Sequence, residues 1–164
     1  ASILVTKADN IFIYDTVFDE CYSAAIYCVG DPLVNEVPVN SNIKVSNCII
    51  KNSNFELIKA TLYKDICIDS SHCSDLSNSF VSIALVANGI ITTRCSDVII
   101  TKNTFNTTDG TGVKIESVNG MTTITDNIFI DNDFACINLQ ESGIEAGDVL
   151  NHNERVIISS KESA

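Results

Sequence analysis

The chain has 164 residues, of which 45% are hydrophobic, and a formal net charge of −11 at pH 7. A single domain of this size has a sizeable core, but with only ten Lys and Arg it lacks the basic patches that nucleic acids or anionic membranes require. The longest apolar run, near FVSIALVANGII, is too short to span a bilayer. The acidic composition is compatible with neutral sugars, cations or basic partners.

Short alternating segments begin near residue 11 and recur along the chain. They have a period of two and are bounded by Asn, Asp, Ser or Gly, which is typical of strands and not of helices. The first set comprises residues 11–13, 43–45, 66–68, 98–100 and 123–125. Each of these segments leads to an apolar anchor, and the anchors are Phe18, Ile49, Cys73, Phe105 and Phe129. Eight residues beyond each anchor a second alternating segment begins, at Ile26, Leu57, Val81, Val113 and Ile137.

The constant eight-residue step predicts a solenoid of about five stacked coils. Successive anchors are 31, 24, 32 and 24 residues apart, so long and short units alternate. A β-sandwich also has short strands between turns, but it explains neither the fixed step nor a polar column two residues before the anchors. This column consists of Asn47, Asn103 and Asn127, with Thr16 and Ser71 as polar substitutes. We expect the Asn amides to hydrogen-bond from coil to coil and the anchors to stack in one interior column.

The long units carry extra residues at 29–41 and 85–96, and we expect both insertions at the same place in the coil. Pro32 and Pro38 predict a loop in the first insertion, and the segment GIITTRC predicts a third strand in the second. The repeat frame is lost after Leu139. The predicted organisation is therefore 1–139 as β-helix coils and 140–164 as an irregular last coil, a cap or a junction segment.

The anchors and the Asn column resemble those of right-handed parallel β-helices of the pectate-lyase-like superfamily, over about residues 11–139. That superfamily includes pectin-degrading enzymes, alginate epimerases and bacteriophage tailspikes that bind or cut host-surface polysaccharide. Enzyme motifs of the superfamily are missing: there is no Asp-Asp with a downstream Gly-His-Gly, and the only Asp-Pro, Asp31–Pro32, is followed by Leu33. Arg94 is the only Arg within the repeats, and no Asp cluster surrounds it in sequence. The resemblance thus implies an all-β right-handed parallel β-helix without identifying one enzyme family.

The resemblance is strongest to a fragment of a tailspike. The chain starts within the alternating pattern, no capping helix or secretion signal precedes it, and its seven Cys form no CxxC motif. These features imply that the thiols are free and that the chain is part of a longer, homotrimeric protein. They also imply a virion tail assembled in the host cytoplasm, with an extracellular location as the alternative. The implied function is to bind, or to bind and degrade, a host cell-surface polysaccharide. The alternatives are a stand-alone polysaccharide lyase, hydrolase or epimerase, and a structural shaft without activity.

Acidic residues are frequent two and four positions beyond the anchors. Asp109 and Asp133 share one of these columns and Asp131 lies close by, so adjacent coils would bring their carboxylates within about one strand spacing, ~4.8 Å. Such carboxylates serve glycoside hydrolysis as acid and nucleophile, or bind a cation such as calcium as a cofactor. Asp is also common at bends without any function, which is the alternative interpretation. Sugar rings would stack on exposed aromatic residues, and the candidates are Tyr14, Tyr22, Tyr27 and Tyr63.

Overall fold

The computed structural model describes residues 1–76, 88–108, 110–117, 120–132, 136–141, 149–151 and 156–158, and all its named strands pair in parallel. Sheet A consists of β1 (Ile3–Thr6), β4 (Ile26–Val29), β7 (Ile58–Thr61), the first part of β10 (Ile90–Thr101), β12 (Val113–Ser117), β15 (Ile137–Glu141) and β17 (Val156–Ile158). Sheet B consists of β2 (Ile11–Tyr14), β5 (Asn40–Ser46), β8 (Tyr63–Asp69), the second part of β10, β13 (Thr122–Thr125) and β16 (Val149–Asn151). Sheet C consists of β3 (Val17–Asp19), β6 (Ile49–Ser53), β9 (His72–Leu76), β11 (Thr104–Thr108) and β14 (Ile128–Asn132).

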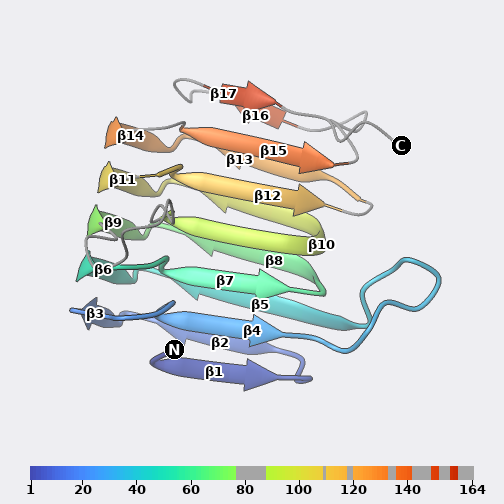
Figure 1. Ribbon diagram of the computed structural model, residues 1–164. Coiled ribbons are helices and arrows are strands. Elements are labelled where there is room, and N and C mark those ends of the chain that lie inside the picture. The colour runs from blue at the N-terminus through green and yellow to red at the C-terminus, as the bar shows by residue number, and fades with distance from the viewer. Residues whose placement is uncertain are drawn as a thin grey trace, which may run out of the picture.

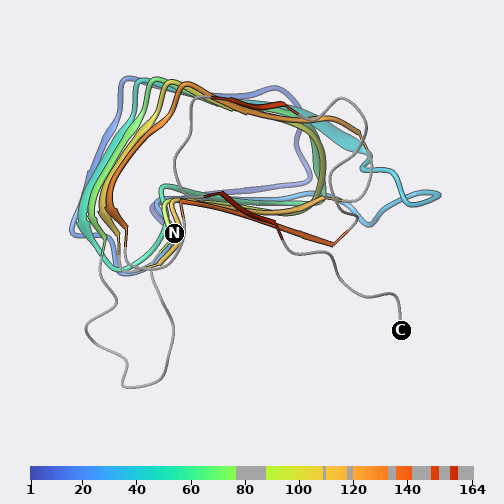
Figure 2. The same ribbon diagram turned by 90° about the horizontal axis from the view of Figure 1, so that it is seen from above.

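The three sheets form the three sides of a climbing coil, and the coils superpose when seen along the axis (Figures 1 and 2). From above, the chain runs counterclockwise through sheets A, B and C while it rises toward the viewer, so the coil is right-handed. Within the described part of the chain, five coils carry a strand on all three sides. The predicted fold, a right-handed parallel β-helix of about five coils, is confirmed. Beyond Leu139, β16 pairs with β13 and β17 pairs with β15, while the predicted division of the chain at this residue stays a prediction.

The predicted interior column exists, with one member shifted. Ladder register aligns five buried side chains in sheet C, namely Phe18, Ile50, Cys73, Phe105 and Phe129. The choice of Ile49 is wrong, because Ile49 aligns with Val17 and His72 and is 39% exposed. Successive side chains of a strand point to opposite faces, so a shift of one residue exchanges inside for outside.

The second apolar column lies in sheet A and shows where the insertions are. It consists of Ile26, Ile58, Ile90, Val113 and Ile137, all fully buried. The predicted member Leu57 is therefore one residue too early, because Ile58 occupies the column. Ile90 occupies the place predicted for Val81, and Val81 itself lies outside the described residues. The GIITTRC segment is not an added strand, because Ile90–Thr93 pair within sheet A and β10 continues into sheet B through an irregularity between Thr93 and Cys95.

The two insertions are consequently at different corners, contrary to the expectation. The second lies between β9 and β10, where the chain passes from sheet C to sheet A. The first lies between β4 and β5, where the predicted loop is confirmed as a projecting hairpin (Figure 1). Val34 and Val37 exchange two backbone hydrogen bonds of 3.0 Å, and Asn35 and Glu36 between them have φ of 50° and 64°. Two positive φ values define a type I′ turn, which Asn favours.

A buried polar ladder crosses the coils beside the interior column. The Asn127 Oδ1 accepts from the Asn103 backbone N–H at 2.9 Å, and the Asn103 Oδ1 accepts from the Ser71 N–H at 3.0 Å. The Ser71 hydroxyl oxygen accepts from the Cys48 N–H at 3.1 Å. The predicted coil-to-coil bonding is thus confirmed, although the third Asn bonds outside this ladder, where the Asn47 Nδ2 donates to the Asp15 Oδ1 of the preceding coil at 2.7 Å. Asn47 stands one residue away, on the exposed corner with a φ of 52°, and Cys48 takes the ladder position.

Each corner of the coil contains a column of residues in the left-handed conformation. At the corner from sheet B to sheet C these are Asp15, Asn47, Ser70, Lys102 and Asp126, with φ between 51° and 57°. Asn and Asp tolerate this conformation well, which explains the polar residues that bound the strands. Lys102 and Leu62 also adopt it, at 57° and 66°, because the ladders on both sides fix the bend whatever the side chain.

All seven Cys lie in the described part of the chain as free thiols, five of them buried. Burial raises the pKa of Cys28 to about 12 and that of Cys95 to about 11, and it also raises the pKa of Cys73. These thiols therefore stay protonated and behave as small apolar side chains of the core. In the described residues, no helix has the length and apolar character needed to cross a membrane.

Candidate functional site

The acidic cluster predicted from the sequence falls mostly outside the described residues. Asp109 and Asp133 are not described, and Asp131 is described only as backbone of β14. The nearest described ladder pair is Thr108 with Asn132. Among the described residues, no group of three His, Cys, Asp or Glu side chains is arranged to hold a metal ion. The catalytic or calcium-binding role of the three Asp residues stays a prediction.

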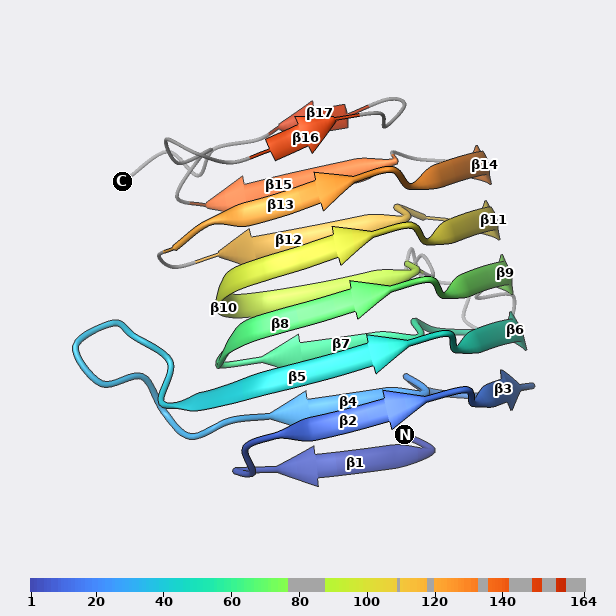
Figure 3. The ribbon, with the colours of Figure 1, turned by 180° about the vertical axis from the view of Figure 1, so that it is seen from behind.

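The described residues form a different site, an open groove of about 480 Å³ on the outer face of sheet B. It crosses four successive strands, β5, β8, β10 and β13, which lie side by side in Figure 3. The groove thus runs along the coil axis and not along a strand. Its lining residues are Asn42, Asp65, Ile66, Cys67, Asp97, Ile99, Met121 and Thr123. We name it the sheet B groove.

One wall of the sheet B groove repeats from coil to coil at the corner between sheets A and B. Asn42, Asp65, Asp97 and Met121 occupy one register column, because their neighbours Ile43, Ile66, Val98 and Thr122 pair in the ladder. The first three of these wall residues have positive φ, between 53° and 72°. Both Asp residues are exposed. Adjacent coils are separated by about one strand spacing, ~4.8 Å, so Asn42, Asp65 and Asp97 offer one polar group at each such step, and Met121 ends the wall with an apolar side chain.

Backbone contacts hold the end of this wall in place. The Asp97 Oδ1 accepts a hydrogen bond of 3.0 Å from the Met121 N–H of the next coil. Gly120, with a φ of 96°, lies directly against it, and a Cβ at this glycine would stand 2.6 Å from the same oxygen. At the other end, the Asn42 amide donates to the Asn10 Oδ1 at 2.8 Å. Asp97 and Asn42 are therefore held in place by hydrogen bonds to neighbouring coils.

The floor of the groove is mainly apolar. Cys67, Ile99 and Thr123 form one column of outward side chains in successive coils, and Ile99 is 44% exposed. Burial, followed by the nearby Asp69 carboxylate, raises the pKa of the Cys67 thiol, which keeps it neutral. Asp69 itself accepts from the Ser46 hydroxyl at 2.5 Å and lies 3.8 Å from the Lys44 ammonium. Lys44, which lies beside Cys67 in the ladder, is thus paired with a carboxylate.

An aromatic pair extends the same face toward the first coil. Phe12 aligns with Lys44 in the column that continues into the floor, and Tyr14 follows two residues later on the same side of β2. Their rings are nearly parallel, with centroids 6.3 Å apart, and the two residues are 51% and 47% exposed. Exposed ring surface of this kind suits the apolar face of a sugar.

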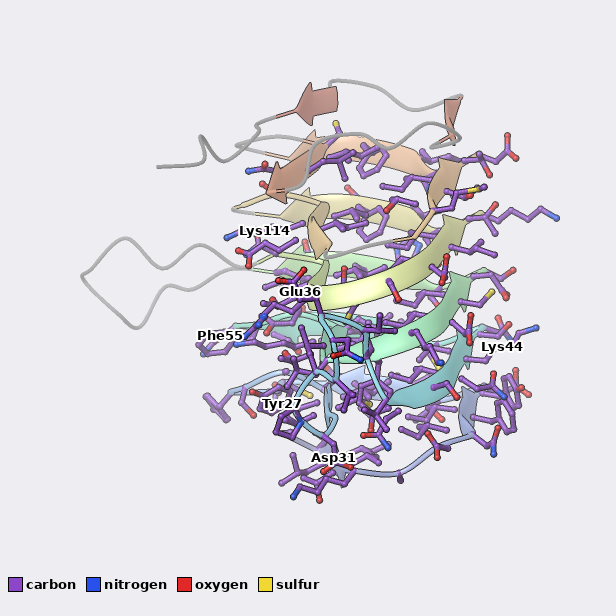
Figure 4. The ribbon with its side chains drawn as sticks, turned by 90° about the vertical axis from the view of Figure 1, so that its right-hand side faces the viewer. Tyr27, Asp31, Glu36, Lys44, Phe55 and Lys114 are labelled. Atoms are coloured by element: carbon purple, nitrogen blue, oxygen red, sulfur yellow. The ribbon has the colours of Figure 1, made fainter. Side chains whose placement is uncertain are left out.

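The other Tyr candidates differ in their accessibility. Tyr22 is 75% exposed and lies in a smaller recess of about 230 Å³ with Glu20 and Asn54. Tyr27 is half-buried on the outer face of sheet A, with the Lys59 ammonium 5.4 Å from the ring centroid. Figure 4 shows Tyr27 on the opposite side of the molecule from Lys44. The prediction for Tyr63 is wrong, because β8 turns this residue inward and its side chain is fully buried.

The sequence contained a signal for the groove that the anchor alignment missed. The residue immediately before each alternating triplet of sheet B is polar in four successive coils, namely Asn10, Asn42, Asp65 and Asp97. Acidic residues counted forward from the anchors lie in or after sheet C, so they do not include this column.

The stacked coils and the groove along their axis define the class of this protein as a right-handed parallel β-helix. A family model described as right handed beta helix region matches residues 1–149, and the chain belongs to this family. No curated protein and no solved structure matches the chain.

Proposed function

We propose that this protein binds a polysaccharide chain along the outer face of sheet B. The observation that carries the proposal is the sheet B groove itself, which crosses four coils and has a polar wall side chain in three successive ones. A ligand that fits such a groove is linear and has a repeating structure, as a polysaccharide does. The apolar floor and the Phe12–Tyr14 pair supply surface for sugar rings, and the Asn and Asp side chains supply hydrogen-bond partners for hydroxyl groups.

The biological setting in this proposal is that of a bacteriophage tailspike. The chain would be the β-helix part of a longer protein that assembles as a homotrimer in the host cytoplasm and binds a host cell-surface glycan from the virion tail. The β-helix family and the seven free thiols support this setting. An extracellular polysaccharide-degrading enzyme of the same fold is the alternative.

Cleavage of the bound chain is the second candidate function. Asp65 and Asp97 are register neighbours in adjacent coils and both line the groove, so two carboxylates stand where the glycan would lie. Hydrolysis with retention requires two carboxyl groups about 5–5.5 Å apart, which is close to one coil step. The cluster of Asp109, Asp131 and Asp133 stays a second proposed location for the same chemistry or for calcium.

The test uses a matched pair of substitutions and a panel of polysaccharides. Ile99→Trp fills the groove, whereas Ile130→Trp places the same ring on sheet C at a residue of nearly equal exposure, 42% against 44%. We expect the parent and the Ile130→Trp variant to bind one polysaccharide in affinity electrophoresis, and the Ile99→Trp variant to lose at least tenfold in affinity. Equal binding by both variants would reject the sheet B groove as the site. Release of reducing ends by the parent, lost in Asp97→Asn, would establish cleavage.

A further inference from the structure

Resting on the proposed function, we propose that the glycan bound in the sheet B groove is an amino-sugar chain with positive charges, and not a neutral or uronate polymer. The groove's lining contains two acidic residues, Asp65 and Asp97, and none of the described residues that line it is basic. A uronate chain would bring like charges against this wall. A chain with ammonium groups would complement it.

The lysine in the floor column is already paired with a carboxylate. Lys44 is the basic residue closest along the floor column, and Asp69 lies 3.8 Å from its ammonium. On other faces, Lys51 is paired with Asp19 at 3.6 Å and Lys7 with Asp31 at 3.4 Å. The net charge of the chain is −11, so the surrounding field also attracts cationic ligands and repels anionic ones.

Asp65 and Asp97 occupy the same register position on adjacent coils, whose backbones are about one strand spacing (~4.8 Å) apart, so two negative charges line one stretch of the wall. A bare metal ion would leave the apolar surface of Ile99 in the floor and Met121 in the wall exposed to water, and among the described residues no third acidic or His ligand joins the pair. A glucosamine unit brings an ammonium group and an apolar ring face together, which fits both wall and floor.

The experiment compares three oligosaccharide probes of equal length by calorimetry at pH 5.5, namely glucosamine, N-acetylglucosamine and galacturonate oligomers. Glucosamine amines carry charge at this pH, and ordinary Asp side chains are ionised. We expect the glucosamine oligomer to bind the parent roughly fivefold or more tightly than the N-acetylated one, since two exposed charge pairs contribute about this much. The advantage should shrink as NaCl is raised, because salt screens exposed pairs.

Two Asn substitutions make the test specific to the wall. Asp65→Asn removes one groove carboxylate, and Asp75→Asn is the matched control, because Asp75 is also exposed with a φ of 52° but lies at the far corner of sheet C. Both positions accept Asn without backbone strain. The amine advantage should fall at least twofold in Asp65→Asn and stay unchanged in Asp75→Asn.

The possible failures are distinguishable. Tight binding of the N-acetylated oligomer without an advantage for the amine would overturn this inference and leave the proposed function in place. Binding of none of the three probes, by a parent that binds another polysaccharide in the groove, would overturn it in the same way. A parent that binds no polysaccharide at all would overturn both. Oligolysine bound in the groove more tightly than glucosamine oligomers would replace the sugar with a basic peptide as the partner.

Discussion

Phe105 fills the space in which a side chain at residue 89 would stand. A Cβ at Gly89 would lie 2.5 Å from the Phe105 ring, and in the next coil a Cβ at Gly112 would lie 2.6 Å from the Phe129 ring. The two rings stack on each other with centroids 5.0 Å apart. One coil earlier the sizes are reversed, with Leu57 in the glycine column and Cys73 in the ring column. Each coil therefore combines one large and one small residue at this corner.

This size compensation predicts how Phe105 and Gly89 behave when substituted. Phe105→Ala should lower the free energy of unfolding by about 3–5 kcal/mol, because the ring is fully buried. Gly89→Ala should also destabilise, since the ring must shift. Phe105→Leu replaces the ring with a smaller side chain and so makes room for a Cβ at residue 89. The double variant Gly89→Ala/Phe105→Leu should therefore lose less unfolding free energy than the sum of the losses in the two single variants. Urea unfolding measures the parent, the three single variants and the double variant, and Phe12→Ala, at a 51% exposed site, is the control. Strict additivity would contradict the compensation.

The polar ladder predicts a large cost for losing one amide. Asn127 is 4% exposed, accepts from the Asn103 N–H and donates to the Ile100 carbonyl at 3.0 Å. Asn127→Leu keeps the volume but leaves both backbone groups buried without these partners, so it should cost more than about 2 kcal/mol in urea unfolding. Thr125→Val is the control, because it removes a half-buried outer hydroxyl bond to Thr101 that water replaces. A cost equal to that of the control would mean that the ladder adds no stability.

The repeat was predictable from the sequence, but its register at several residues was not. Cys48, Ile49 and Ile50 are consecutive apolar residues, so a period of two cannot decide which of them faces inward. The choice is made by the ladder, which pairs Ile50 with Cys73. Similarly, the sequence that begins at Val81, eight residues beyond Cys73, alternates like a strand. The ladder nevertheless places Ile90, and not Val81, in the buried column of sheet A beside Ile58.

The candidate site was less predictable than the fold for a related reason. A groove depends on which outward side chains from four coils lie side by side, and that requires the register of every coil. Asp65 and Asp97 are 32 residues apart and become neighbours only when β8 and β10 pair. An anchor alignment that is wrong by one residue in a single coil misplaces such a pair completely.

The thiols predict a specific labelling pattern. Titration of the unfolded protein without reductant should find close to seven free groups, and fewer would indicate disulfides and a secreted protein. In the native protein, a maleimide should label mainly Cys21 and Cys67, the two that are half-exposed. Labelling at Cys67 should accelerate only as the pH rises well above the ordinary thiol pKa of about 8.5, because its pKa is raised. Mass spectrometry of the labelled parent and of the labelled Cys67→Ser variant shows which label is carried by Cys67.

The last prediction concerns Glu56, a carboxyl that is only 5% exposed and whose pKa is raised by burial. A raised folded-state pKa means that the folded protein favours the protonated form. Its contribution to stability is therefore fully present below the unfolded-state value of about 4.3 and is lost as the pH rises through the folded-state pKa. Glu56→Gln mimics the protonated form, so it should raise the urea midpoint at pH 7 and leave it nearly unchanged at pH 4. Glu20→Gln, at an exposed corner residue, should show no such difference. A loss of stability in Glu56→Gln at pH 7 would mean that the ionised carboxylate is the favoured form in the fold.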